Sequence, residues 1–315
     1  MNCITNMDTI IFDVKFNAKP VIISGYTKLI FSNYKLNKNL FEHYINNDFD
    51  DLEYEGSIFN QDVSNLPSTL TLIDFGCKFN QNVSNLPSAL THLTFGEYFN
   101  QDVSKLPPNL TYLIFSDSFN KDVSVLPPFL TYLTFGDNFN QNVSNLPLAL
   151  THLTFGNKFN QNVSALPPFL THLTFGLYFN QDVSSLPQGI THLTFGCLFN
   201  QRYNIPPNIK YLKLDANNPH IINFLPNSVA ELELDYNFNL EMNNLPTSIK
   251  ILRICKHSKY NVDLNCLPDF VEELHLSINY KKRILHIPSN LKKLICHIDY
   301  PYKDDFVMCD VETYL

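Results

Sequence analysis

The sequence predicts a β-rich solenoid, a stack of about twelve 20-residue repeats with one parallel strand per repeat and little helix. Three recurring marks support this fold class. A phenylalanine followed by asparagine returns every 20 residues from Phe59 to Phe199, and a second phenylalanine column runs from Phe75 to Phe195. A Leu-Pro pair recurs at the same interval over residues 66–187. Such a period indicates that each repeat is one unit, which is stable only when it is stacked on its neighbours.

The strand of each repeat is expected in the segment Leu-Thr-His-Leu-Thr-Phe, as in residues 90–95. Side chains alternate between the two faces of a strand, so Leu93 and Phe95 share the core face while His92 and Thr94 share the other. We therefore expect parallel strands at 72–75, 92–95, 112–115, 132–135, 152–155, 172–175 and 192–195. Weaker forms of the motif at 207–214, 229–234, 249–254, 271–276 and 291–296 extend the stack.

Turns are expected on both sides of the strand. We call each 20-residue repeat a row of the stack. Glycine follows the second phenylalanine in most rows, which indicates either a positive φ or a lack of room for a Cβ atom. The proline of each Leu-Pro pair fixes φ and removes an amide donor, so that arc is expected to be extended rather than helical. The asparagine column over 60–200 is expected to bond along the stack to backbone groups of the turns, because polar side chains beside a buried core need partners.

The regularity of the repeats divides the chain into four parts. Residues 1–50 are interpreted as an N-terminal cap with divergent repeat-like strands, including one at Thr27–Phe31, and residues 51–200 as the regular array. Residues 201–298 are degenerate repeats of the same solenoid, and residues 299–315 are a C-terminal cap or tail. Caps are expected because the exposed ends of such stacks need covering.

Composition excludes several classes of protein. The formal net charge is −8, which argues against a nucleic-acid-binding protein with a basic face. The seven cysteines follow no pattern, which is typical of reduced thiols in a reducing compartment. The N-terminus lacks the features of a secretory signal, and the chain holds no run of 18 apolar residues. We therefore expect a cytoplasmic protein with no membrane partner.

The run Phe-Asn-Gln-Asp-Val-Ser-x-Leu-Pro, with Leu-Thr-His-Leu-Thr-Phe-Gly, resembles the FNIP repeat family, named for its Phe-Asn and Ile-Pro marks. The resemblance is specific over 59–200 and weaker over 201–298. It implies a leucine-rich-repeat-like fold, a source among slime moulds or giant viruses of amoebae, and a function in protein recognition. Some members carry an F-box before the array. Residues 1–50 show only a short helical pattern near Leu40–Ile45 and no three-helix F-box.

One strand position carries a column of histidine and tyrosine side chains: His92, Tyr112, Tyr132, His152, His172, His192 and Tyr211. By strand alternation these side chains project from the strand-lined face, away from the core. Parallel imidazoles in a row do not converge as zinc ligands must, so no metal site is expected. The column is either a stacked surface ladder or a contact surface, since His and Tyr offer apolar area with polar tips. We predict that these residues bind a partner protein.

Other polar columns do not indicate catalysis. Asp62, Asp102, Asp122 and Asp182 alternate with asparagines, which we interpret as a spacing of like charges rather than a calcium or acid–base site. The chain has no nucleotide-binding, hydrolase or zinc-protease motif. Its polar residues recur as columns, whereas a nucleophile is a singular residue. We therefore expect no catalytic residue, no cofactor and no enzyme activity.

The sequence thus predicts a non-catalytic protein–protein interaction module, an adaptor that binds another protein, such as a host protein, through the strand-lined face. One alternative is a structural or self-associating repeat protein, because regular stacks pair end to end when their caps are weak. Another, by family analogy, is a substrate receptor in a ubiquitin-ligase pathway. Concentration-dependent mass separates self-association from the binding of a different protein.

Overall fold

The protein is a β-solenoid of about 14 turns with parallel strands and almost no helix, which confirms the predicted fold class. The computed structural model describes residues 3–6, 8–20, 25–34, 52, 54–202 and 205–315. The chain forms two compact units, Met1–Phe159 and Asn160–Leu315. The short helix expected near Leu40–Ile45 and most of the segment searched for an F-box lie outside the described residues.

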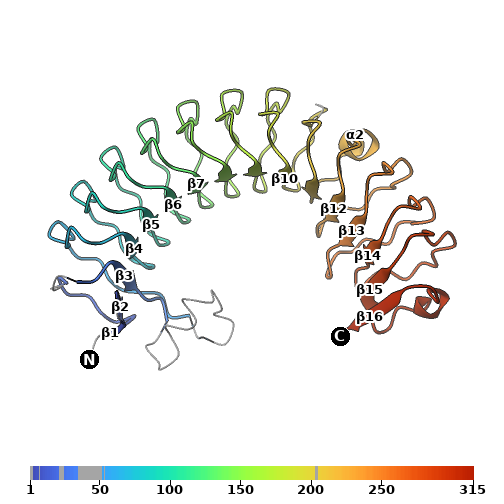
Figure 1. The fold of residues 1–315 in the computed structure, drawn as a ribbon, viewed down its shortest axis with the longest axis horizontal. Helices are drawn as coiled ribbons and strands as arrows, with labels where there is room; N and C mark the ends of the chain where they lie inside the picture. Colours follow the sequence, from blue (N-terminus) through green and yellow to red (C-terminus); the bar gives the residue numbers. More distant parts are fainter. Residues whose placement is uncertain (1–2, 7, 21–24, 35–51, 53, 203–204) are drawn as a thin grey trace. The chain divides into compact units, whose positions relative to one another are not determined.

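Unit 1 (Met1–Phe159) contains strands β1 to β8, each hydrogen-bonded to the next (Figure 1). The strands are β1 Cys3–Asn6, β2 Thr9–Phe12, β3 Lys28–Phe31, β4 Leu72–Asp74, β5 His92–Thr94, β6 Tyr112–Ile114, β7 Tyr132–Thr134 and β8 His152–Thr154. β1 is antiparallel to β2, and the other pairs are parallel. Residues of one sequence column pair directly, as Tyr112 does with Tyr132, so the 20-residue register is also the register of the sheet. The strands predicted in this unit are confirmed.

Unit 2 (Asn160–Leu315) contains strands β9 to β16, all parallel and paired in chain order (Figure 1). The strands are β9 His172–Thr174, β10 His192–Phe195, β11 Tyr211–Leu214, β12 Glu231–Leu234, β13 Ile251–Ile254, β14 Glu273–His275, β15 Lys293–His297 and β16 Asp310–Tyr314. The degenerate repeats thus form strands as predicted, and the segment 299–315 adds the strand β16. Among the described residues of this unit, helix is limited to α2 Pro219–Asn223 and a 3₁₀ turn at Lys303–Asp305.

The core of the regular repeats is a double ladder of aromatic rings, which continues as a single ladder in the later repeats of unit 2. In unit 1 the two phenylalanine columns interleave: ring centroids are 3.7 Å apart between Phe135 and Phe139, and 5.7 Å apart between Phe135 and Phe155 in the next row. All these rings are stacked and almost completely buried. In unit 2 the ladder passes to tyrosine, because Tyr260 stacks 6.1 Å from Phe238. The sequence columns therefore mark continuous ring stacks.

The ring ladder of unit 2 is interrupted where α2 forms. Asn218 lies four residues after Leu214, as Phe199 lies four residues after Phe195, and it is 2% exposed. Its side chain caps the helix, because Oδ1 accepts hydrogen bonds from the amides of His220 and Ile221 at 3.1 and 3.3 Å. The following proline is suited to the first helical position, since it has no amide hydrogen to satisfy. The cap residue thus explains both the missing ring and the local helix.

The asparagine column bonds along the stack, as predicted. The amide of Asn80 donates to Oδ1 of Asn60 at 2.9 Å, and the amide of Asn100 donates to Oδ1 of Asn80 at the same distance. The side-chain amide of Gln81 also donates to Oδ1 of Asn60, at 3.0 Å. Unit 2 repeats this pattern between Asn200 and Asn180. Each asparagine therefore satisfies backbone donors of the next row, which is a structural role.

The glycine column is explained mainly by space. Gly76 has a φ of +65°, the conformation that favours glycine. Gly96, Gly136 and Gly196 do not need a positive φ, but a Cβ on any of them would overlap backbone atoms of the residue one row earlier. By contrast, a Cβ on Gly189 would lie 3.4 Å from the carbonyl oxygen of Leu170, an ordinary contact. Close approach of successive turns therefore selects the glycines after the strands.

We predict that Gly196→Ala lowers the free energy of unfolding by about 1–3 kcal/mol, because the added methyl group forces two turns apart. Gly189→Ala is the matched control, because Gly189 lies seven residues earlier in the same repeat. It should be neutral or stabilising by up to about 1 kcal/mol, since alanine reduces the entropy of the unfolded chain. Urea denaturation followed by circular dichroism measures both variants. Equal midpoints for the two would show that the turns do not pack as tightly as described.

Candidate functional site

The strand-lined face of unit 1 carries four stacked rings, which we name the aromatic column of unit 1. Its members are His92, Tyr112, Tyr132 and His152, on the adjacent strands β5 to β8. Successive ring centroids are 5.4, 4.5 and 5.7 Å apart. The other outward positions of these described strands hold threonine or isoleucine, so the face over β5–β8 has no Asp, Glu, Lys or Arg side chain. His92 is exposed, whereas the other three rings are half-buried by their neighbours.

The hydrogen bonds of the preceding threonines assign the histidine tautomer. Thr91 Oγ1 donates to the carbonyl oxygen of Thr71 at 3.1 Å, and it lies 2.8 Å from Nδ1 of His92. A hydroxyl has one hydrogen, so Nδ1 of His92 carries its own hydrogen and donates it to Thr91. Nε2 is then an acceptor on the strand-lined face. Partial desolvation by the neighbouring groups lowers the pKa of His92 although its side chain is exposed, and this end of the column is uncharged at neutral pH.

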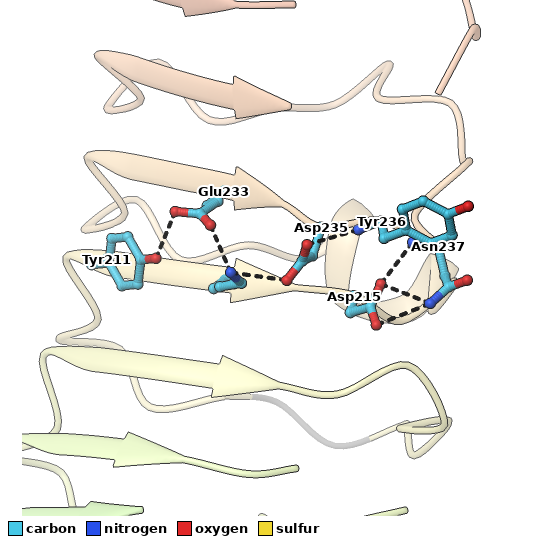
Figure 2. Close-up of polar contacts among 7 residues, drawn as sticks. Tyr211, Asp215, Glu233, Asp235, Tyr236 and Asn237 are labelled. Carbon is cyan, nitrogen blue, oxygen red and sulfur yellow. Dashed lines mark hydrogen bonds and ion pairs between the residues drawn. The ribbon is translucent and has the colours of Figure 1, made fainter. Parts of the chain in front are cut away.

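In unit 2, the predicted contact residues His172, His192 and Tyr211 lie on the paired strands β9 to β11. The rings of His172 and His192 are stacked with centroids 4.0 Å apart. Tyr211 lies 5.7 Å from His192, and its hydroxyl donates to Oε2 of Glu233 at 2.8 Å (Figure 2). Burial and this bond raise the pKa of Tyr211 to about 12, so the hydroxyl keeps its proton. This column therefore ends in a charged network rather than continuing as aromatic rings.

The charged network of unit 2 begins at β11 and β12. Nζ of Lys213 lies 2.8 Å from Glu233 and 2.9 Å from Asp235. Although desolvation opposes it, the hydrogen bond from Lys213 holds the pKa of Asp235 below its ordinary value. Figure 2 shows the network reaching the turn, where the amide of Asn237 donates to Asp215 at 2.7 Å. These charges are already paired within the unit.

Ion pairing continues over β12 to β14. Arg253 contacts Glu231 and lies 3.6 Å from Glu273, and Nε2 of His275 lies 2.5 Å from Glu273. The bond with His275 holds the pKa of Glu273 below its usual value. The strand-lined face is therefore neutral and aromatic over β5–β8, and charged but internally paired over β11–β14. The sequence analysis did not predict this network. Its signal is the alternation of charged and apolar residues along the later strands, such as Glu-Leu-Glu-Leu at residues 231–234.

The aspartate column has a local structural role. The amide of Ser64 donates to Oδ1 of Asp62 at 3.0 Å, and the amide of Ser84 donates to Oδ1 of Asn82 at 2.8 Å. Asp and Asn are interchangeable because either oxygen closes the same turn. Asp102 and Asp122 lie in successive rows, so spacing of like charges does not explain the whole column.

A cavity of about 370 Å³ lies on the strand-lined face of unit 1, over β1 to β6 and beside the aromatic column. Ile30 and Leu72 form part of its wall, and Tyr112 of the aromatic column lines one side. Asp74 also lines it, in the position that threonine occupies in rows such as that of Thr94. Desolvation raises the pKa of Asp74 to about 6, although the amide of Gly76 donates to its Oδ1 at 3.0 Å. The sequence feature that could have indicated this cavity is Asp74, a carboxylate at a strand position that most regular rows fill with threonine.

The described residues do not gather three or more His, Cys, Asp or Glu side chains into a group that could hold a metal ion. Likewise, no helix there combines the length and the apolar composition that crossing a membrane requires.

Comparison with known proteins places these features in a family. The model of the FNIP Repeat matches residues 79–118, 122–158, 159–198, 199–236 and 217–257, which is more than half of the chain. The crystal structure of CroV588, a circular leucine-rich-repeat protein of a giant virus, is 28% identical with a TM-score of 0.66, over 95% of this chain and 51% of that one. YopM from Yersinia enterocolitica is 19% identical with a TM-score of 0.52, over 91% of this chain and 60% of its own. The chain thus spans about half the length of CroV588. No curated protein matches it.

We predict that Asp74→Asn raises the free energy of unfolding by about 1–2 kcal/mol at pH 7.5. The folded state holds the Asp74 proton more tightly than the unfolded state, whose pKa is near the ordinary 3.8. Stability is therefore lost as pH rises from about 3.8 to about 6, and asparagine removes that loss while still accepting from Gly76. Urea midpoints between pH 4 and 8 measure the effect. Asp102→Asn is the control, and a gain for Asp74→Asn that is equal at pH 4 and pH 8 would contradict the assignment.

Proposed function

Since the chain belongs to the FNIP repeat family, we propose that it is a non-catalytic adaptor that binds another protein through the strand-lined face of its solenoid. Leucine-rich-repeat-like folds are generally scaffolds for protein interaction. We place the binding site on the aromatic column of unit 1. The shorter column of His172, His192 and Tyr211 in unit 2 is a second contact in this proposal. The partner is a different protein, a host protein if the source is a giant virus, and the protein acts in the cytoplasm.

The observation that carries this proposal is the unbroken, neutral aromatic column over β5 to β8. Stacking already orders Tyr112 and Tyr132, so docking costs little further side-chain entropy. The face lacks Asp, Glu, Lys and Arg over these described strands, so covering it desolvates no formal charge. Tyrosine hydroxyls and Nε2 of His92 provide polar contacts at the ring edges. Over β11–β14, by contrast, a partner would have to desolvate charges that are already paired.

The non-catalytic assignment is supported by the arrangement of the polar groups. The serine, asparagine and aspartate side chains of the regular rows take part in repeated turn hydrogen bonds, as Ser64 and Asp62 do. Catalytic serines are instead paired with a base that is held by a third group. A role as substrate receptor of a ubiquitin ligase rests on family analogy alone, because most of the segment in which an F-box would be sought lies outside the described residues.

The proposal predicts that the variant Tyr112→Ser with Tyr132→Ser binds the partner at least about tenfold more weakly, because central tyrosines dominate such interfaces. The partner is first identified by cross-linked affinity capture from amoeba lysate, and affinities are then measured by calorimetry. Binding should change little with salt, since the face carries no formal charge.

Phe129→Ser is the matched control, because this ring is 60% exposed outside the strand-lined face. It should bind the partner as the parent protein does. If the double tyrosine variant folds and retains its affinity, the binding site lies on another surface and the proposal is wrong. The variant His172→Ser with His192→Ser tests the column of unit 2 in the same assay.

A second candidate function, self-association, is favoured by the surface near β16. Among the described residues β16 pairs only with β15, and Val307 and Met308 are 82% and 90% exposed. Exposed apolar side chains beside an unpaired strand edge favour pairing with another copy. Sedimentation from about 5 to about 200 µM decides between the two functions. A mass that rises with concentration, and that Val307→Ser with Met308→Ser abolishes, would favour self-association, whereas a constant mass favours the adaptor.

A further inference from the structure

We infer that the cavity over β1 to β6 of unit 1 receives a basic side chain, an arginine or a lysine, that projects from the bound protein partner. This inference deepens the proposed function and rests on it. It names the chemistry of one partner residue and the place where that residue binds. It stands on the charge balance of the cavity, the apolar character of its wall and its position beside the aromatic column.

Among the described lining residues of the cavity, no positive charge compensates Asp74. Asp8 also lines the cavity, but its carboxylate accepts from Thr9 Oγ1 at 2.8 Å and lies 3.3 Å from Nζ of Lys28. Lys28 is the only Lys or Arg among the described residues that line the cavity, so none of these residues supplies a free cation to Asp74. Oδ1 of Asp74 accepts from the amide of Gly76, and no described residue donates to its Oδ2.

The neighbourhood of Asp74 strengthens this negative potential. A second cavity of about 300 Å³ shares Asp74 and brings Glu97 and Asp117 to the same part of unit 1. The other titratable groups that line the two cavities with Asp74 are Asp8, Lys28, His92, Tyr112, Tyr54 and Cys77. Of these, only Lys28 brings a permanent positive charge, and Asp8 pairs with it. A cation placed at Asp74 would therefore be attracted by several carboxylates and repelled by one paired ammonium group.

The wall of the cavity suits a long side chain with an apolar stem. Ile11 and Ile30 are buried at its base, and Leu72 continues the apolar surface towards Asp74. Arginine and lysine place their methylene groups along apolar surface while the charged head reaches a polar partner. The ring of Tyr112, which stacks on His92, adds an aromatic wall that attracts a cation. A cavity of about 370 Å³ has room for one such side chain.

Position favours a protein side chain over a free cation. His92 and Tyr112 line the cavity and are also the first two members of the aromatic column. A polypeptide docked along Tyr132 and Tyr112 therefore passes the mouth of the cavity. A basic residue of that polypeptide would enter beside the column, while the rings hold the chain that carries it. The two features adjoin within unit 1, because they share His92 and Tyr112.

The experiment titrates blocked arginine, Nα-acetyl-arginine methylamide, into the full chain, and follows isoleucine methyl resonances by NMR. We expect saturable binding that shifts Ile11 and Ile30, and at least about tenfold weaker binding of the citrulline analogue, which has the same shape without the charge. Asp74→Asn should weaken arginine binding about tenfold or more, whereas Asp102→Asn should not change it. Lowering the pH from 7.5 to 5 should weaken it by roughly tenfold, as Asp74 becomes protonated.

Several results would overturn the inference: no saturation by blocked arginine or lysine, equal binding of citrulline, or an equal effect of Asp74→Asn and Asp102→Asn. Spermidine that binds at least about tenfold more tightly than blocked arginine would assign the cavity to a free polyamine instead. Tyr132→Ser separates this test from that of the proposed function, because Tyr132 does not line the cavity. That variant should keep arginine binding and lose partner affinity. Partner binding that survives loss of the arginine site would overturn only the further inference.

Discussion

Close stacking of successive turns is the constraint on which the other features of each unit depend. A Cβ on Gly96 would overlap the backbone of Gly76 in the row before it, so the turns touch without side chains between them. At that separation the rings of Phe75 and Phe95 stack with centroids 5.7 Å apart, and Asn60 reaches the amide of Asn80. Ring stacking, glycine and the asparagine bonds therefore require one another, and a change in the spacing would disturb all three.

The same stacking governs the surface, because every outward position becomes a column of near-identical side chains. Aromatic rings can occupy successive positions of such a column because they stack on one another, as Tyr112 and Tyr132 do. Charged residues must alternate in sign, and Lys213, Glu233 and Arg253 do so on three adjacent strands. The strand-lined face can therefore be either neutral and aromatic or charged and internally paired. Only the neutral kind can be covered by another protein without desolvating existing ion pairs.

The sequence predicted what is periodic and failed where the period changes. Phe135 and Leu133 recur at fixed intervals, so their burial and the strand between the turns followed from spacing alone. Tyr260 continues the ring ladder, but it follows Phe238 by 22 residues, and that shift hid its equivalence. The helix at Pro219 depends on how Asn218 bonds to amides near it in space, which residue type alone does not determine. The column of predicted contact residues lies on the paired strands, as with Tyr112 and Tyr132, but whether it binds a partner stays a prediction.

Departures from the repeat are also where specificity can arise. An array of identical rows offers a partner the same contacts at every register, so the column alone cannot decide where a polypeptide binds. Asp74 in place of threonine breaks that equivalence at one position, beside the end of the column at His92. Desolvation raises the pKa of the Asp74 carboxyl to about 6, which is a cost to folding that a cationic ligand would offset. A repeated surface that supplies affinity and one irregular cavity that fixes the register are therefore complementary, because neither could select a partner alone.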